Sequence, residues 1–343
     1  MYKVIGVGFF FLIATISCKK STIHNVSDVA VIDNSKLLNQ VNKIQTIAFG
    51  SCSKSDEEQV LWDDISATDP DLWIWLGDAI YGDTEDMSIM RTKYNRQKNN
   101  PAYKALNTNT PIIGIWDDHD YGINNGDRTF AAKAASRNEF YNFLDIPSNS
   151  TLRKREGAYQ SYHFESVMGK VSVILLDTRY FKDPIDYKKG QYVYNENIDI
   201  LGNDQWKWLQ TELNRAADIT IIANGVQVIP KDHKYEKWAN YPSSRKRLFE
   251  FLDKIDSKIV LLSGDRHFGE LSQITLESGK TLSEITTSGM THTYEGLTEE
   301  YNEYRVGDFT NKLNYGLMKI SSENITLELR GDNGTILETL VIE

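Results

Sequence analysis

Side chains that can bind metal ions follow four short apolar stretches of this sequence. They are Cys52 after residues 47–49, Asp78 and Tyr81 after Leu72–Leu76, Asp118, His119 and Asp120 after Pro111–Trp116, and Asp265 and His267 after Lys258–Leu262. Short apolar runs of this kind indicate buried strands. Because open α/β sheets bind ligands beyond the carboxyl ends of their strands, we expect these side chains to meet on one edge. Any one of them alone is explained as well by a solvated turn or a core side chain.

Together these side chains form a coherent set of metal ligands. Carboxylates, a histidine, a thiolate and a phenolate suit ferric iron beside a divalent cation, and the oxygen ligands also suit calcium, magnesium or manganese. Two cations ~4 Å apart hold a phosphoryl group and lower the pKa of bound water. Asp78 is our candidate for the carboxylate that bridges them.

The other apolar patterns predict alternating strands and helices, followed by strands alone. We expect helices starting at Ser55 or Asp56, over Thr129–Leu144, after Asn203 or Asp204 and over Ser243–Ile255, with strands over 171–176, Ile219–Ala223 and Val226–Ile229. From Ile274 onward the apolar runs are strand-like: Leu282–Thr286, Leu317–Ile320, Ile325–Leu329 and Ile336–Ile342. This order indicates an α/β fold of two facing sheets with helices outside.

The first residues resemble an export signal. Lys3 precedes the apolar segment Val4–Ile16, which is too short for an ordinary membrane span. Thr15-Ile16-Ser17-Cys18 resembles a bacterial lipobox, although Thr15 stands where leucine is usual. We therefore expect a lipoprotein signal peptide over 1–17, lipidation of Cys18, a polar tether over 18–43 and one catalytic domain over 44–343. Such a protein is exported and membrane-anchored in a bacterial envelope; a plain secretory peptide is the alternative.

Composition narrows the class of protein further. A share of 40% hydrophobic and 25% charged residues is typical of a globular protein, and the net charge of -10 argues against a nucleic-acid backbone as partner. The two cysteines are Cys18 and Cys52, so lipidation of Cys18 leaves Cys52 without a disulfide partner. A lone thiol in an exported protein is buried and inert, linked to another chain, or a metal ligand.

Six blocks of the sequence carry a more specific pattern. They are Phe49-Gly50-Ser51-Cys52, Gly77-Asp78-Ala79-Ile80-Tyr81, Trp116-Asp117-Asp118-His119-Asp120, Leu176-Asp177-Thr178-Arg179-Tyr180, the stretch LGNDQWKWL at 201–209, and Ser263-Gly264-Asp265-Arg266-His267. In this order they resemble the PhoD-type alkaline phosphatase family of calcineurin-like metallophosphoesterases, over residues 44–295. The resemblance implies a four-layer αββα fold, a two-sheet β-sandwich flanked by helices. It also implies a binuclear or multinuclear centre of iron with calcium or another divalent metal such as manganese, magnesium or zinc.

The resemblance also assigns roles to individual residues. It implies metal ligands at Cys52, Asp78, Tyr81, Asp118, Asp265 and His267, with Cys52 and Tyr81 on iron. His119 would face the phosphate or protonate the leaving oxygen, oriented by Asp120. Asn124, Gln227 and Arg179 are candidate contacts of the site, and an ion pair behind the strand explains Arg179 equally well.

These features predict a metal-dependent phosphoric ester hydrolase that acts on monoesters, diesters or both. A metal-bound hydroxide would attack phosphorus in line, while both cations offset the charge on the equatorial oxygens. Two alternatives come from other classes of protein. One is a non-catalytic surface-binding lipoprotein, and the other is a metal-dependent hydrolase of a non-phosphate ester or an amide.

Overall fold

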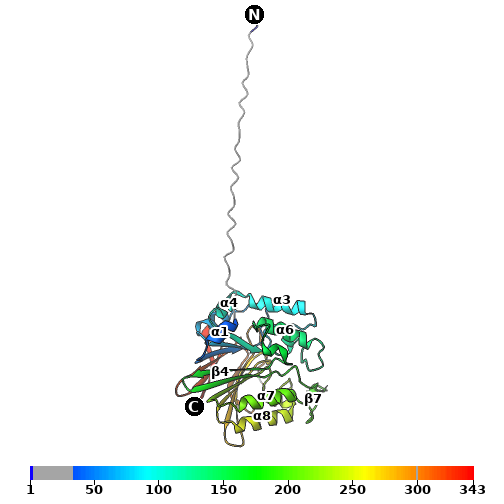
Figure 1. Cartoon of the computed structure of the whole chain (residues 1–343), viewed down its shortest axis with the longest axis vertical. Coiled ribbons are helices and arrows are strands. Elements are labelled where there is room, and N and C mark those ends of the chain that lie inside the picture. Colours follow the sequence, from blue (N-terminus) through cyan, green and yellow to red (C-terminus); the bar gives the residue numbers. More distant parts are fainter. Residues whose placement is uncertain (3–33, 299) are drawn as a thin grey trace. The chain divides into compact units, whose positions relative to one another are not determined.

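A computed structural model describes residues 1–2, 34–298 and 300–343 of the chain (Figure 1). The helices are α1 (Asn34–Gln40), α2 (Trp62–Ala67), α3 (Met87–Lys98), α4 (Pro101–Asn107), α5 (Asp118–Tyr121), α6 (Lys133–Phe143), α7 (Gly202–Leu213) and α8 (Pro242–Lys254). The strands are β1 (Thr46–Gly50), β2 (Leu72–Leu76), β3 (Ile112–Ile115), β4 (Gln160–Ser166), β5 (Gly169–Leu175), β6 (Tyr187–Lys188), β7 (Gln191–Tyr192), β8 (Ile219–Ala223), β9 (Lys258–Ser263), β10 (Gly269–Thr275), β11 (Thr281–Thr287), β12 (Arg305–Thr310), β13 (Tyr315–Ile320), β14 (Ile325–Arg330) and β15 (Ile336–Ile342).

The strands form two large mixed sheets and one small hairpin, β6–β7. One sheet has six strands in the order β15-β14-β13-β1-β2-β3, and the other has seven in the order β12-β10-β11-β9-β8-β5-β4. Strands β1, β2 and β3 are parallel in the first sheet, and β5, β8, β9 and β11 are parallel in the second. Each sheet therefore gathers the carboxyl ends of its parallel strands on one edge.

Side-chain alternation places both faces of the seven-stranded sheet in apolar cores. In β5, Val171, Val173 and Leu175 belong to the large core that also contains residues of the six-stranded sheet. Their neighbours Ile174 and Leu176 belong to a second core with residues of α7 and α8. Because successive strand side chains point to opposite faces, this sheet is covered on both sides.

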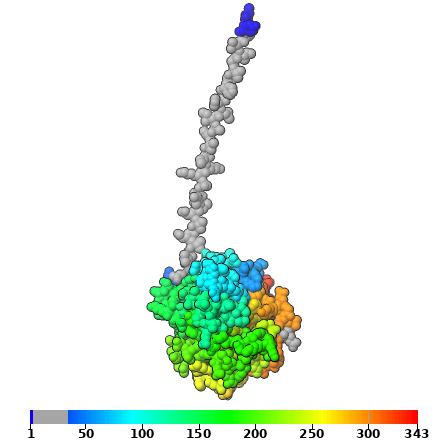
Figure 2. Space-filling model, turned by 90° about the vertical axis from the view of Figure 1, so that its right-hand side faces the viewer, coloured from blue at the N-terminus to red at the C-terminus, as the bar shows by residue number. Residues whose placement is uncertain are grey.

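Helices cover the outer face of each sheet. Figure 1 shows α3, α4 and α6 on one side of the strands and α7 and α8 on the other. The Trp62 ring of α2 packs edge-on against Trp73 and Trp75 of β2, with ring centroids 4.9 and 5.5 Å apart. Figure 2 shows the same division on one surface, where cyan and blue-green segments lie above green and yellow ones. The predicted α/β fold of two sheets flanked by helices is confirmed.

Several predicted element boundaries differ from the structure. The helix expected from Ser55 or Asp56 begins only at Trp62, because residues before it form turns and Leu61 takes the N-cap position. The helix expected from Thr129 begins at Lys133. Residues 226–229 are not a strand; the backbone N–H groups of Val228 and Ile229 donate to the Glu284 carboxylate instead of to a neighbouring strand.

The folded unit begins earlier than the predicted boundary at residue 44. Helix α1 packs Leu38 against the large core. The buried Asn34 amide donates to Ile112 O at 2.6 Å and to Leu144 O at 3.0 Å. Residues 34–43 are therefore part of the domain and not of a tether. The expected lipidation site Cys18, most of the signal peptide and the tether up to residue 33 lie outside the described residues. Among the described residues, no helix is long and apolar enough to cross a membrane.

Candidate metal centre

The predicted ligands lie where parallel strands of both sheets end. Cys52 follows β1, Asp78 follows β2 and Asp118 follows β3, while Asp265 and His267 follow β9 of the other sheet. The two edges meet in three dimensions, since carboxylate oxygens of Asp118 and Asp265 approach within 4.8 Å of each other. Sandwich packing therefore brings side chains from both sheets to one rim.

The backbone at this rim has an unusual conformation. Cys52, Asp78, Asp265 and His267 have φ values of 62°, 49°, 68° and 54°, in the left-handed region. Such conformations cost on the order of 1–3 kcal/mol each and persist where surrounding structure fixes them. Gly77 is part of that structure, because a Cβ there would lie 2.4 Å from Cβ of Asp117. The strand ends approach so closely that a larger residue at position 77 has no space.

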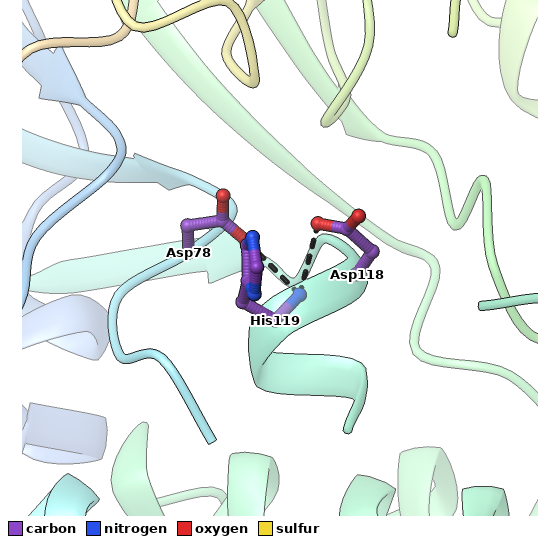
Figure 3. Close-up of side chains that lie close together, drawn as sticks. All are labelled: Asp78, Asp118 and His119. Carbon is purple, nitrogen blue, oxygen red and sulfur yellow. Dashed lines mark hydrogen bonds between the residues drawn. The ribbon is translucent and has the colours of Figure 1, made fainter. Parts of the chain in front are cut away.

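One group of candidate ligands consists of Asp78, Asp118 and His119 (Figure 3). The backbone N–H of His119 donates to Asp78 Oδ1 at 3.3 Å and to Asp118 Oδ1 at 2.9 Å. Figure 3 shows the two carboxyl groups on either side of His119, at the beginning of α5. The backbone thus holds Oδ1 of each acid, while Oδ2 of Asp118 accepts from the Asn125 backbone N–H at 2.6 Å and Oδ2 of Asp78 lies 3.5 Å from the Cys52 thiol.

A second group consists of Asp117, Asp118 and Asp265. Asp118 is common to both groups, whereas the bridging role expected for Asp78 stays a prediction. Oδ2 of Asp117 is buried and makes no hydrogen bond within the described residues. Two adjoining sets of acids that share one carboxylate have the arrangement expected of a multinuclear metal centre.

A thiol and a phenol complete the rim beside Asp78. The buried Cys52 thiol lies 3.5 Å from Asp78 Oδ2 and 3.1 Å from the Ser288 hydroxyl, and it is also hydrogen-bonded to Tyr81. The Tyr81 hydroxyl oxygen lies 3.3 Å from Nε2 of His267 and 3.0 Å from Nε2 of His292. The structure therefore brings Cys52, Asp78, Tyr81 and His267 together, as predicted, and adds His292.

The electrostatics of the rim favour bound cations. Burial raises the pKa of Asp78 well above its usual range, and the nearby thiol and acids raise it further. Burial likewise raises the pKa of Cys52 to about 11 and that of Asp265 to about 8. Burial lowers the pKa of His267 to about 3, so its imidazole is neutral and free to act as a ligand. Bound cations would stabilise the ionised acids and the thiolate and would so lower the pKa values that burial raises. This donor set therefore fits metal ions.

His119 has a different partner from the one predicted. Its Nδ1 lies 2.7 Å from Oδ1 of Asp83, whereas Asp120 accepts hydrogen bonds from the backbone N–H groups of Asp117 at 2.6 Å and Ala79 at 3.1 Å. The helical turn of α5 points the Asp120 side chain back toward Asp117, so Asp83 and not Asp120 contacts the His119 ring in this structure, and the orienting role of Asp120 stays a prediction. Burial lowers the pKa of His119, but the contact with Asp83 and the charge of Asp118 outweigh it and raise the pKa overall.

Arg179 lies behind the rim in a buried ion-pair network. Its Nε donates to Asp117 Oδ1 at 2.6 Å, and its Nη1 pairs with Glu236. Lys182 pairs with the other oxygen of Glu236 and donates to Asn125 O at 3.0 Å. The structure thus shows the ion pair that the sequence left as one explanation of Arg179, and a phosphate contact stays an untested prediction.

The two remaining candidate contacts lie in different surroundings. Asn124 is exposed and lines a cavity of about 540 Å³ next to Asp118 and His119. Gln227 is buried, and its amide donates to Glu270 at 2.6 Å and to the Thr286 hydroxyl at 2.9 Å. Gln227 therefore supports strands β10 and β11, and any contact with a ligand stays a prediction.

Three residues of the rim were not identified from the sequence as site residues: Asp83, Asp117 and Ser288. Asp117 lies within one of the motifs that carried the resemblance, and Asp83 lies two residues after another, so their closeness in sequence to the predicted ligands was the available signal. Ser288 connects candidate ligands that follow strands of different sheets. Its hydroxyl lies near the Cys52 thiol and accepts from the His267 backbone N–H at 2.7 Å. No spacing pattern indicated Ser288, because its position depends on the path of the chain after β11.

Comparison with known proteins decides the family. The model of the PhoD-like phosphatase family matches residues 47–329. The chain belongs to this family. Membership makes the protein a phosphoric ester hydrolase, and the acid and histidine clusters of the rim agree with a metal-dependent one. A search of curated proteins found no match.

Solved structures show the same fold at low sequence identity. The structure of PhoD matches with a TM-score of 0.70 and 17% identity, covering 87% of this chain and 68% of that one. GAP50, described as the anchor in the inner membrane complex of Plasmodium, matches at 0.56 and 14%, covering 87% and 88%. A dimetal phosphatase from Danio rerio matches at 0.52 and 13%, covering 87% and 98%. At such identities these likenesses concern the fold, and the site has to be argued from its own residues.

Proposed function

We propose that this PhoD-like phosphatase hydrolyses phosphate monoesters, diesters or both at a centre of iron with calcium or another divalent cation. The observation that carries the proposal is the two clusters of candidate ligands that share Asp118, together with the buried Cys52 thiol beside Asp78. Cys52 and Tyr81 would hold iron, because thiolate and phenolate suit a ferric ion. Asp78, Asp118, Asp265 and His267 would complete the set. Cations bound there would acidify water for the attack and offset negative charge on the phosphoryl oxygens.

His119 supplies the proton for the leaving oxygen in this proposal. Nδ1–H donates to the Asp83 carboxylate, which directs Nε2 away from Asp83. The side chain is partly exposed and lines the cavity, so a substrate can reach it. The raised pKa of His119 keeps the imidazolium populated at higher pH than in a free histidine.

Export and anchoring belong to the same proposal. The Lys3 and Val4–Ile16 pattern and the lipobox-like Cys18 support an enzyme held outside the inner membrane by lipid. Radiolabelled palmitate should enter the wild-type protein and not the Cys18→Ser variant. Labelling that persists in the variant would remove Cys18 as the lipidation site.

Elemental analysis of natively expressed protein, combined with a screen of mono- and diesters, tests the function. We expect iron, a second cation, visible charge-transfer absorption and release of nitrophenol from phosphate esters. Cys52→Ser should lose the visible absorption, whereas Cys18→Ser, the same change at the other cysteine, should keep it. Absorption that survives Cys52→Ser would remove Cys52 from the iron site.

The same experiment separates the two alternative functions. GAP50 shows that a protein described as an anchor can have this fold. Colourless, metal-free protein without activity on phosphate esters would favour a binding role for this chain. Turnover of sulfate esters or amides alone would favour a metal-dependent hydrolase of another bond.

A further inference from the structure

Tyrosines form much of the wall of the cavity beside the metal-ligand candidates. The lining includes Tyr187, Tyr192, Tyr235 and Tyr294 in addition to Asp118 and His267. The cavity volume of about 540 Å³ is in the range of pockets that enclose a whole organic ligand. A phosphate group alone would fill a small part of it, so the wall also contacts the rest of the ester.

One side of the cavity is a stack of rings that leads outward from the metal rim. The His267 and Tyr294 rings are nearly parallel, with centroids 4.8 Å apart and an interplanar angle of 12°. Tyr235 stacks on Tyr294 at 6.4 Å and 21°. The Arg266 guanidinium lies 4.4 Å from the Tyr235 ring centroid and fixes the far end of the stack.

The other aromatic side is the β6–β7 hairpin. Tyr187 and Tyr192 are cross-strand partners with ring centroids 5.0 Å apart, and Lys189–Gly190 forms the turn with φ values of 51° and 80°. The Tyr192 hydroxyl lies 3.4 Å from Asn125 Oδ1, and the Asn125 backbone N–H donates to Asp118 Oδ2 at 2.6 Å. The hairpin is therefore connected to the loop that carries a metal-ligand candidate.

These tyrosines expose ring surface that the rest of the fold leaves uncovered. Tyr187, Tyr235 and Tyr294 are 56%, 38% and 43% exposed, although they line one cavity together. Polar side chains of Asp127 and Lys234 lie among the same lining residues. Exposed ring faces with polar groups between them suit a ligand that has an apolar face and a hydrogen-bonding edge.

We propose that this cavity selects phosphate esters whose organic group is a ring with an apolar face and a polar edge. Nucleosides and sugars share this chemistry. The inference rests on the proposed phosphoesterase function, and Tyr187 is the residue that most directly tests it. Its ring contacts Tyr192 on the exposed hairpin, so its removal leaves the cores of the sandwich intact.

The test measures kcat/KM of the purified full chain for adenosine monophosphate, glucose phosphate and glycerol phosphate. We expect a preference for one or both ring esters over glycerol phosphate, which Tyr187→Ser lowers about tenfold and Tyr187→Phe preserves. Tyr194→Ser is the matched control, because Tyr194 lies beyond the hairpin and bonds Glu196 at 2.6 Å. The ester whose advantage falls identifies the ring as a base or a sugar.

Two results separate failure of this inference from failure of the function. Equal turnover of all three esters, unaffected by Tyr187→Ser, would overturn ring selection and leave the phosphoesterase function standing. Turnover of none would overturn the function, and calorimetric binding of adenosine and methyl glucoside would then decide the inference. Ring binding that Tyr187→Ser weakens supports it, and absence of binding contradicts it.

Discussion

Buried acids lie in two adjoining regions of the rim, and the chain itself neutralises one of them. Behind the rim, Asp117 and Glu236 both contact Arg179, and Glu236 also contacts Lys182. All four side chains are almost completely buried. Such a network neutralises its charges internally and needs nothing from solution.

On the rim itself, acids face one another and a thiol. Asp78, Asp118 and Asp265 lie close together, and Cys52 lies 3.5 Å from Asp78. Burial raises the pKa of Asp78, Asp265 and Cys52, which means that their ionised forms are costly in the protein as it stands. Burial would raise the pKa of Asp118, but Arg179, His119 and Lys182 hold that pKa low. Asp78, Asp265 and Cys52 are therefore the groups whose ionised forms bound cations would stabilise.

The contrast separates two uses of a buried carboxylate. A carboxylate paired with arginine or lysine holds loops together, whereas a carboxylate surrounded by other acids is a candidate for a cation. Asp117 belongs to both regions, since one oxygen contacts Arg179 and the other is buried without a hydrogen bond in the described part of the chain. This residue would couple the metal centre to the network that supports it.

The largest expected effect comes from removing a charge on the rim. Asp78→Asn should reduce kcat roughly a thousandfold, because a bound cation contributes several kcal/mol to the transition state. The fold should persist, since the variant removes an acid whose ionised form is disfavoured by burial. Activity and circular dichroism measure both, with exposed Asp63→Asn as the control. Full activity in Asp78→Asn would mean that this acid holds no essential cation.

Removing a charge from the paired network should act on stability instead. Arg179→Met would leave Asp117 and Glu236 buried without their guanidinium, at a cost of about 3–5 kcal/mol. Urea unfolding measures this, and Glu236→Gln in the same chain should recover part of the loss. Normal stability with lost activity would contradict the structural role and support the phosphate contact that the sequence allowed for Arg179.

The sequence predicted the rim because of a simple topological rule. Apolar runs that end before Cys52, Asp78 and Asp118 become neighbouring parallel strands of one sheet, so their carboxyl ends share an edge, whereas the run before Asp265 is a strand of the other sheet. It was therefore predictable that these runs form buried strands and that the polar side chains at their carboxyl ends lie near one another.

The orientation of individual side chains was not predictable in the same way. Asp120 and His119 are adjacent in sequence, yet the helical turn of α5 sends them to different partners. For Arg179, the ion pair involves Glu236, a partner 57 residues later that the local sequence does not indicate. The late start of α2 likewise depends on tertiary contacts, since Ser55 and Asp56 are good capping residues that the fold does not use as caps.

A smaller expected effect is the dependence of stability on pH, which should differ between the protein without metal and the protein with bound cations. An unfolded Asp265 has an ordinary pKa near 4, whereas the folded chain raises it to about 8. The contribution of Asp265 to the stability of the metal-free protein should therefore be largest below about pH 4 and be lost as the pH rises to about 8. Solvent reaches the half-buried Asp265, which limits the size of the loss.

Bound cations should reverse this dependence, because they favour the ionised carboxylates. Urea midpoints measured across this pH range, with a chelator and with added calcium and iron, test the expectation. Metal binding should also release protons, which calorimetry in buffers of different ionisation enthalpy detects. Identical pH curves with and without cations would show that the facing acids are neutralised in another way.

The smallest expected effect concerns His119, a rim histidine whose ring contacts the carboxylate of Asp83. Asp83→Asn removes the carboxylate that helps to raise the pKa of His119, so the imidazolium should lose its proton at lower pH. If His119 protonates the leaving oxygen, the alkaline limb of the kcat profile should move down by about one pH unit or less, because Asp83 is partly exposed. Exposed Asp86→Asn, on the same loop, is the control. A profile that does not move would assign protonation of the leaving group to water and leave His119 as a group that only faces the phosphate.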